Sequence, residues 1–309
     1  MKRVLLTGGT GFVGANLARR LLRDGHAVHL LVRPAHAGWR IEEIRHDIQL
    51  HELELADANA ASKTVAAIKP DWIFHLAAHG AYSWQKDAAQ IFQTNLIATV
   101  NLLESALRLG FEAFVHTGSS SEYGFKDHAP AETEWVEPNS HYACAKAAAT
   151  QYCRYSAQAQ KAHIVTLRLY SAFGPFEDPN RLMPKLIEHG LRGELPLLVN
   201  PDIARDYIYI DDVCEACILA AQMPSCEPGP VYNLGTGVQT SLRDVVDVSR
   251  RLLDIAAEPQ WGSMLPRIWD TSVWVANNQR IKAELGWKPR FNFEEGFLEM
   301  ANWARKNLP

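Results

Sequence analysis

The sequence predicts an α/β fold, in which a Rossmann-type doubly wound parallel sheet carries a smaller interleaved α/β substrate domain. Short β-branched and leucine-rich runs alternate with longer segments whose apolar residues recur at helical spacing, and this alternation builds a parallel sheet covered on both faces. A glycine-rich turn follows the first of these runs. The chain has 309 residues, 47% of them hydrophobic, so it can bury a large core without disulfides or metal ions.

The predicted strands are short apolar runs bounded by turn residues. They lie at residues 3–7, 27–32, 49–55, 72–76, 113–117, 163–170, 206–210 and 231–234. The helices predicted from apolar spacing lie at residues 12–24, 61–68, 88–109, 141–161 and 211–223.

The amino-acid composition of the chain changes after Tyr170. Proline, tryptophan and irregular sequence become more frequent there, which indicates a second, smaller domain. We expect residues 1–170 to form the dinucleotide-binding domain, with returning segments near residues 205–240. Residues 171–204 and 241–309 then form the smaller domain.

Charge and composition exclude several classes of protein. Lys and Arg number 31 against 35 Asp and Glu, for a formal net charge of −4, so no overall positive field attracts nucleic acid. The apolar stretch near the start is too short for a signal peptide, and no run is long enough to span a membrane. Five cysteines without paired spacing indicate neither a disulfide framework nor a metal site. We therefore expect a cytoplasmic protein that binds no nucleic acid, membrane or metal.

Three glycines follow the first predicted strand at Gly8, Gly11 and Gly14, and Phe12 and Val13 open the next helix. Gly8 permits a tight turn, Gly11 lets the backbone approach a pyrophosphate, and Gly14 lets the helix pack closely on the strand. The free N–H groups and the helix dipole favour an anion at this place. The alternative is a turn with a purely structural role, but strand, glycines and helix together predict a dinucleotide site.

Tyr142 and Lys146 lie four residues apart in a strongly helical segment and therefore share one helix face. A free tyrosine has a pKa of about 10, so it can exchange protons near neutral pH only if its phenolate is stabilised. A neighbouring lysine cation supplies that stabilisation, and its N–H groups can also hold the cofactor's ribose. We expect both residues to be catalytic and to contact the cofactor.

The order and spacing of several short motifs resemble the extended short-chain dehydrogenase/reductases, the family of nucleotide-sugar epimerases, dehydratases and reductases. The resemblance extends from Val4 to about Trp303. Its motifs are Gly8-x-x-Gly11-x-x-Gly14, His75-Leu76-Ala77-Ala78, Tyr142-x-x-x-Lys146, Arg205-Asp206-Tyr207 and Leu285-Gly286-Trp287-x-Pro289.

The resemblance implies a catalytic hydroxyl at Ser119, four residues before the Tyr123-Gly124 pair, where it would hydrogen-bond the reacting oxygen of the substrate. Ser120 or Ser121 could serve if the loop is shifted, and we expect Ser120 to contact substrate as well. Related dehydratases carry an acid two residues before that tyrosine, where this chain has Ser121. This departure argues against 4,6-dehydration.

The resemblance also implies residues that bind the substrate, a nucleotide-diphosphate sugar. Ser171 replaces the asparagine that usually contacts it. Arg205 and Arg267 match two arginines that clamp the diphosphate, a task that suits guanidinium groups. Arg181 stands where relatives often have Asn. The alternative for either clamping arginine alone is a surface salt bridge.

The residue after the second predicted strand bears on the choice of cofactor. Arg33 occupies the place where an acidic side chain would accept a hydrogen bond from the ribose of NAD. Because a guanidinium can instead pair with the 2′-phosphate of NADP, with help from Arg40, we favour NADP over NAD. The alternative is that Arg33 stacks on the adenine or faces solvent. The resemblance places Glu54, Leu55, Ala77 and Ala78 along the cofactor too.

These residues favour an NADPH-dependent reductase acting on the C4 ketone of a nucleotide sugar. The alternative is a 4-epimerase with tightly bound NAD, which would use the same side chains. A 4,6-dehydratase and a nicotinamide-sensing regulator without activity are less favoured. Residues 88–109 and 141–161 carry apolar residues over more than one stripe, and in the family such helices pair across a dimer interface, so we expect a homodimer.

Overall fold

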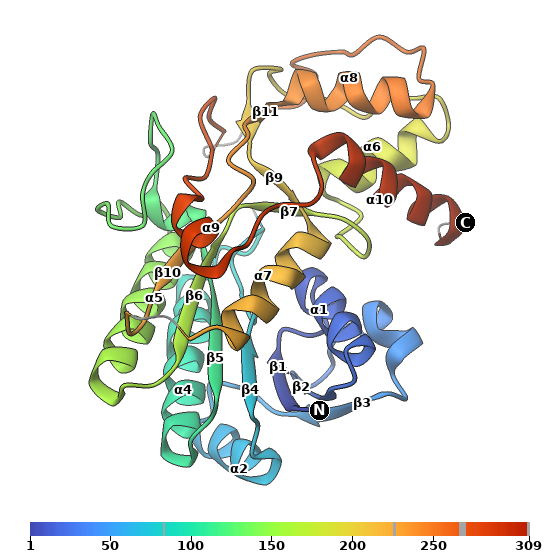
Figure 1. Ribbon diagram of the computed structural model, residues 1–309. Helices are drawn as coiled ribbons and strands as arrows, with labels where there is room; N and C mark the ends of the chain where they lie inside the picture. Colours follow the sequence, from blue (N-terminus) through green and yellow to red (C-terminus); the bar gives the residue numbers. More distant parts are fainter. Residues whose placement is uncertain (83, 225–226, 266–269, 308–309) are drawn as a thin grey trace.

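A parallel sheet forms the centre of the protein (Figure 1). The computed structural model describes residues 1–82, 84–224, 227–265 and 270–307. In these residues the sheet has seven strands in the order β10-β6-β5-β4-β1-β2-β3, and every neighbouring pair is parallel. The strands are β1 (Arg3–Thr7), β2 (Ala27–Val32), β3 (Ile48–Glu52), β4 (Trp72–His75), β5 (Ala113–Ser119), β6 (Ile164–Leu169) and β10 (Val231–Leu234). The predicted Rossmann-type doubly wound sheet is confirmed.

Alternate side chains of the strands enter separate hydrophobic cores on the two faces of the sheet. In β1, Val4 and Leu6 belong to one core, and Leu5 between them belongs to the other. All three are fully buried. Because both faces of the sheet are covered, its strands are continuous apolar runs and do not alternate apolar with polar residues. This continuity is the pattern that predicted them from the sequence.

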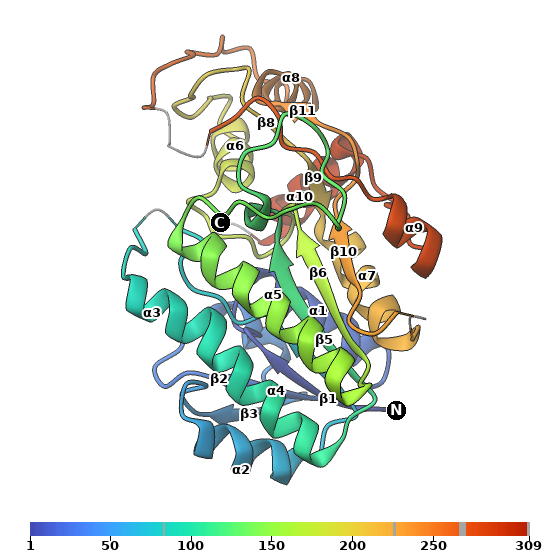
Figure 2. The ribbon, with the colours of Figure 1, turned by 90° about the vertical axis from the view of Figure 1, so that its left-hand side faces the viewer.

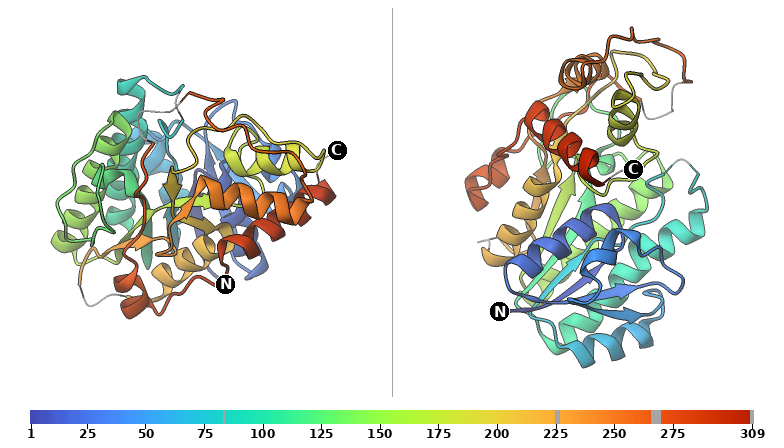
Figure 3. Two further views of the ribbon diagram at one scale, coloured as in Figure 1. Left: turned by 90° about the horizontal axis from the view of Figure 1, so that it is seen from above. Right: turned by 90° about the vertical axis from the view of Figure 1, so that its right-hand side faces the viewer.

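Helices cover both faces, as the view from above shows (Figure 3). The helices α1 (Phe12–Arg23) and α7 (Ile210–Gln222) lie on the face that holds Val4 and Leu6. The opposite face is covered by α2 (Ala58–Ile68), α4 (Ala98–Leu109) and α5 (His141–Gln160). A short turn of helix, η1 (Trp39–Ile44), follows β2.

A second lobe lies beyond the carboxyl ends of the strands (Figure 2). It contains α6 (Leu182–Gly190), α8 (Leu242–Leu253) and α10 (Phe293–Asn307), with the strand pairs β7 (Ser171–Phe173) with β9 (Tyr207–Tyr209) and β8 (Ala204–Arg205) with β11 (Thr240–Ser241). Between its segments the chain returns to the large sheet as β10, followed later by α9 (Gln279–Leu285). Among the helices that the structure describes, none combines the length and the apolar composition of a transmembrane span.

The long helix predicted at residues 88–109 is interrupted. It consists of α3 (Ala88–Phe92), one π-helical turn η2 (Gln93–Ile97) and α4. Asn95 is fully buried in this turn; its side-chain amide donates to the carbonyls of Ile91 (2.9 Å) and His79 (2.6 Å), and its oxygen accepts from the N–H of His79 (3.1 Å). The π-turn therefore interrupts the α-helical hydrogen-bond pattern at Asn95, and the Asn95 side chain holds the loop after β4 in place. Such π-turns are frequent at functional sites.

We expect Asn95→Ala to lower the free energy of unfolding by about 1–3 kcal/mol, because the part-buried N–H of His79 loses its partner and the buried hydrogen bond from Asn95 to the Ile91 carbonyl is lost. The midpoint of urea denaturation measures this effect. Asn59→Ala is the matched control, since Asn59 is exposed on α2. Equal midpoints for both variants would show that Asn95 does not hold the loop.

Candidate active site

The glycine turn between β1 and α1 has no room for larger residues at two of its positions. Gly8 has φ +71°, and an added Cβ would lie 2.7 Å from the backbone of Leu76 and Ala77, at the end of β4. A Cβ on Gly14 would overlap the carbonyl oxygen of Gly8. The turn is closed by the Gly11 N–H, which donates to that carbonyl at 2.9 Å.

Gly11 is less crowded than Gly8 and Gly14. An added Cβ there would meet the Gly8 oxygen at 3.1 Å and, in the described structure, nothing else within 4 Å. Gly11 is the N-cap of α1, and no acidic residue lies in the first helical turn, where Phe12 and Val13 follow it. A backbone surface at a helix N-terminus without side chains or negative charge fits the pyrophosphate of a dinucleotide.

The two arginines considered for the cofactor differ in their surroundings. Arg33 is exposed directly after β2, and the described structure includes no hydrogen bond or ion pair from its guanidinium. Burial lowers the pKa of His79, in the loop after β4, and the positive charge of Arg33 lowers it further. Arg40 is engaged with the second lobe: its Nε donates to the carbonyl of Phe176 at 2.7 Å.

The remaining predicted cofactor residues line the same edge of the sheet. The N–H of Ala77 donates to the hydroxyl of Thr7 at 3.1 Å, and Ala78 follows it. Glu54 is exposed after β3, and Leu55 packs on the core beneath α2. His75 is buried between the hydroxyls of Thr7 (2.7 Å) and Thr99 (2.8 Å), which gives it a structural role.

Ser119, Tyr142 and Lys146 meet where β5 ends. Ser119 is the last residue of β5 and the N-cap of η3 (Ser120–Tyr123), and its Oγ accepts from the N–H of Ser121 at 3.2 Å. Tyr142 lies in the first turn of α5, and Lys146 lies one turn later, buried, with its ammonium donating to the carbonyl of Thr117 at 2.7 Å. The structure thus brings together three side chains from a strand end and a helix.

The buried site shifts both titrating groups. Burial raises the pKa of Tyr142 to about 12; Ser119 and Arg181 oppose this shift, and Glu122 adds to it. Burial lowers the pKa of Lys146 to about 8, against the charge of Glu122. The Lys146 ammonium donates to the carbonyl of Thr117 in this structure, and the expected stabilisation of the Tyr142 phenolate by Lys146 stays a prediction.

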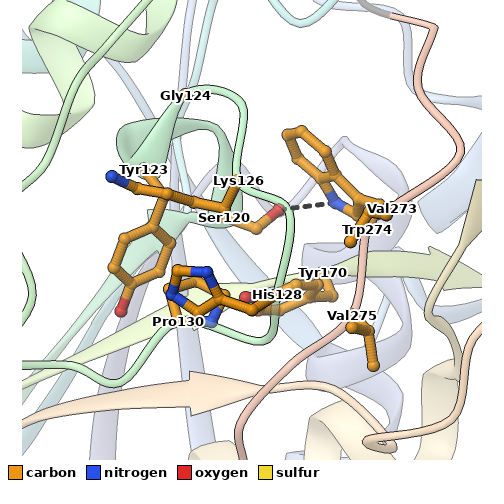
Figure 4. Close-up of a pocket in the computed structure, with 10 residues that line it drawn as sticks. All are labelled: Ser120, Tyr123, Gly124, Lys126, His128, Pro130, Tyr170, Val273, Trp274 and Val275. Carbon is orange, nitrogen blue, oxygen red and sulfur yellow. Dashed lines mark hydrogen bonds between the residues drawn. The ribbon is translucent and has the colours of Figure 1, made fainter.

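Ser120 borders a small cavity beside this centre (Figure 4). Its hydroxyl accepts from the indole N–H of Trp274 at 3.2 Å, so a segment near the end of the chain reaches the strand-end loop. His128 and Tyr170 line the same cavity, together with Tyr123, Gly124, Lys126, Pro130, Val273 and Val275.

The predicted substrate residues lie on the second lobe at the edge of this centre. The Arg205 guanidinium carbon lies 5.3 Å from the ring centroid of Trp274, and an ion pair of 3.4 Å joins Arg205 to Asp270. Ser171 begins β7, and its N–H donates to the carbonyl of Asp206 at 3.0 Å. Arg181 is the N-cap of α6, and its charge reaches Tyr142. The predicted Arg267 lies outside the described residues.

Sequence reasoning missed Glu177 and gave Trp274 no definite role. Glu177 lies on the turn after β7 with its side chain 7% exposed; Oε1 is 3.6 Å from the Arg181 guanidinium, and Oε2 has no hydrogen-bond partner in the described structure. Burial raises its pKa to about 8, although Arg181 opposes the shift. Its spacing of four residues from Arg181 was the available signal.

No group of His, Cys, Asp or Glu side chains in the described residues could hold a metal ion. The side chains that meet at the centre are a tyrosine, a lysine and a serine beside the glycine turn. Such an arrangement can move a proton to or from a substrate hydroxyl.

Comparison with known proteins gives a consistent picture. A model of the "NAD dependent epimerase/dehydratase family" matches residues 4–235. A UDP-glucose 4-epimerase of Mycolicibacterium smegmatis is 30% identical over 98% of both chains, and a probable dTDP-glucose 4,6-dehydratase of Sinorhizobium fredii is 26% identical over 99% of this chain and 93% of its own. The structure of Thermus thermophilus UDP-glucose 4-epimerase in complex with NAD superimposes with a TM-score of 0.86, at 27% identity and 99% coverage of both chains.

Proposed function

The chain belongs to the NAD dependent epimerase/dehydratase family, and on this premise we propose that it is a nucleotide-sugar 4-epimerase. The observation that carries the proposal is the meeting of Ser119, Tyr142 and Lys146 beside the glycine turn at one edge of the sheet. The match to epimerases over nearly the whole chain supports the same activity.

The proposed reaction begins with the proton of the sugar C4 hydroxyl. A bound nicotinamide supplies a hydride acceptor and donor for C4. Tyr142 takes the hydroxyl proton as C4 is oxidised and returns it as C4 is reduced from the opposite face, so the reaction has no net redox change. Ser119 holds the reacting oxygen, and Lys146 holds ribose hydroxyls. Arg205 and Arg267, as the sequence implies, bind the diphosphate by charge-assisted hydrogen bonds, and Arg181 contacts the substrate.

One observation favours a second candidate, the NADPH-dependent 4-keto reductase that the sequence placed first. Arg33 lies directly after β2 and is exposed, and the described structure includes no ion pair of its guanidinium. A group that binds the 2′-phosphate of NADP should be accessible in this way. In a reductase the same Tyr142 would donate a proton to the carbonyl oxygen and would not take it back. The relatives favour the epimerase, so the reductase is the alternative.

Dehydration is the least supported activity of the family. It requires a group that removes the C5 proton, and relatives use an acid two residues before the tyrosine, where Ser121 stands here. The adjacent Glu122 is fully buried in an ion pair with Arg168. A carboxylate held in this way does not reach the sugar.

We expect Tyr142→Phe to reduce turnover about 10²–10⁴-fold, because the variant loses the proton-carrying hydroxyl but keeps the ring. Cofactor affinity should change little, as fluorescence titration will measure. Turnover is followed with a panel of UDP- and dTDP-hexoses by chromatographic separation of the 4-epimers. Lys146→Ala should impair both turnover and cofactor binding. A wild-type rate in Tyr142→Phe would rule out the proposed role of the tyrosine.

The cofactor separates the two candidate functions. An epimerase should retain NAD through purification, and mass spectrometry of the nucleotides released on denaturation identifies it. Net oxidation of added NADPH that occurs only with a 4-keto-sugar nucleotide would instead establish the reductase.

For the second candidate, the reductase, we propose that Arg33 gives the site a preference for NADP(H). One charge-assisted contact to the 2′-phosphate contributes about 1.5–3 kcal/mol, or about ten- to a hundredfold in affinity. Arg33→Asp should therefore reverse the preference in titrations with both cofactors. Arg45→Asp, an exposed arginine after η1, controls for the change in net charge. An NAD preference that Arg33→Asp leaves unaltered would refute this assignment.

We also propose a homodimer formed through α4 and α5, which lie side by side in front of the sheet (Figure 2). Ile97, at the start of α4, is 40% exposed and Tyr155 on α5 is 65% exposed. Light scattering at micromolar concentration should give twice the chain mass of 34.6 kDa. Ile97→Asp should shift the mass toward the monomer, whereas Leu191→Asp after α6 should not. A monomeric wild-type protein would contradict the proposal.

A further inference from the structure

One buried carboxylate that was not among the predicted site residues makes a hydrogen bond to the site. Glu122, in η3, has no exposed surface. Its Oε1 accepts a hydrogen bond from the backbone N–H of Ser119 at 2.8 Å and another from the Thr150 hydroxyl at 3.0 Å. One oxygen atom therefore joins the end of β5 to α5.

Thr150 connects this carboxylate to the two proton-carrying side chains. It lies four residues after Lys146 and eight after Tyr142, so the three occupy one face of α5. The Oε1 of Glu122 thus fixes the catalytic face of the helix relative to Ser119.

The second carboxylate oxygen of Glu122 also accepts a hydrogen bond. Oε2 accepts from the Nε of Arg168 on β6 at 2.9 Å, and Arg168 is 2% exposed. Arg168 in turn donates to the Tyr123 hydroxyl at 2.7 Å, which donates to Asn233 on β10 at 2.8 Å. Gly118 leaves the space for the carboxylate, since a Cβ there would lie 2.6 Å from Oε1.

The charge of Glu122 acts on both proton-carrying groups. It raises the pKa of Lys146, which burial lowers, and it adds to the rise in the pKa of Tyr142 caused by burial. The other titratable groups near Lys146 are Cys153 on α5, His75 on β4 and His116 on β5, and Arg181 at α6 acts on Tyr142. Burial lowers the pKa of both histidines, that of His75 to about 3, and raises that of Cys153 to about 12, so these three are neutral near neutral pH.

We propose that Glu122 is the positioning residue of this site: it holds Ser119 in register with the catalytic face of α5 and supplies a fixed negative charge to Tyr142 and Lys146. The inference rests on the proposed function, which makes these three side chains the reacting groups. Glu122 itself acts through them and does not contact substrate.

The charge is tested with Glu122→Gln, which keeps an oxygen acceptor and removes the negative charge. Since a negative charge favours the ammonium form, its loss should lower the Lys146 pKa from about 8 by about 1–3 units. NMR of protein with an isotope label at the lysine ε-carbon reports this titration without any substrate, and Lys146→Arg assigns the signal.

Glu132→Gln is the matched control. Glu132 lies on the far side of Arg168, where its carbonyl accepts from the guanidinium at 3.4 Å and its carboxylate accepts from the Asn233 N–H at 2.8 Å. The Lys146 titration should be unchanged in this variant. A folded Glu122→Gln protein whose Lys146 titrates as in the wild type would overturn the role of the charge.

Positioning is tested separately with Thr150→Val, which keeps the charge but removes the link to α5. We expect turnover to fall about ten- to a hundredfold, with the Lys146 titration retained. Thr64→Val on α2 is the control, because it removes a comparable hydroxyl, bonded to the Ala60 carbonyl at 2.9 Å, far from the site. Unchanged turnover in Thr150→Val would overturn the positioning role, and this variant decides the matter if Glu122→Gln does not fold.

Failure of the proposed function gives a different result. If Tyr142→Phe turned over at the wild-type rate, the reaction assignment would fall, yet the Lys146 titration in Glu122→Gln would still measure the influence of the carboxylate.

Discussion

The buried ion pair of Glu122 and Arg168 connects the parts on which the site depends. Burying two charges costs several kcal/mol per ion unless geometry and further hydrogen bonds compensate. Here Glu122 also accepts from Ser119 and Thr150, and Arg168 also donates to Tyr123. Both partners therefore make further hydrogen bonds, and the pair joins β5, β6, η3 and α5 at the edge of the sheet where the reacting groups lie.

Two further buried carboxylates attach the second lobe to the sheet. Asp206 accepts from the N–H groups of Thr236, Gly237 and Ala276, so one side chain gathers three segments that are far apart in the chain. Asp212 at the start of α7 accepts from the N–H groups of Arg290 and Phe291 before α10. Carboxylates that satisfy backbone donors of distant segments explain how the lobes interleave without a single linker.

The predicted site residues were recognised because local spacing carried their signal. Glycines at intervals of three, and a tyrosine and lysine four apart, define contacts within one turn or one helix face. Trp274 had no such pattern, and the spacing of Glu177 from Arg181 did not show that the carboxylate would be buried. Glu177 is buried by the packing of its turn, and Trp274 reaches Ser120 across 154 residues of chain. Contacts of this kind depend on tertiary folding.

By itself the sequence determined the class of the fold, the parallel strands and the place of the glycine turn, because periodicity and turn residues act over a few neighbours. It also predicted that Tyr142 and Lys146 lie one turn apart on the same helix. The π-turn at Asn95, the contacts that hold the interleaved lobes together and the environment of Glu122 were decided only by the tertiary structure. A buried polar group must find its hydrogen-bond partners wherever the folded chain places them, and for Glu122 the ion-pair partner, Arg168, lies 46 residues away.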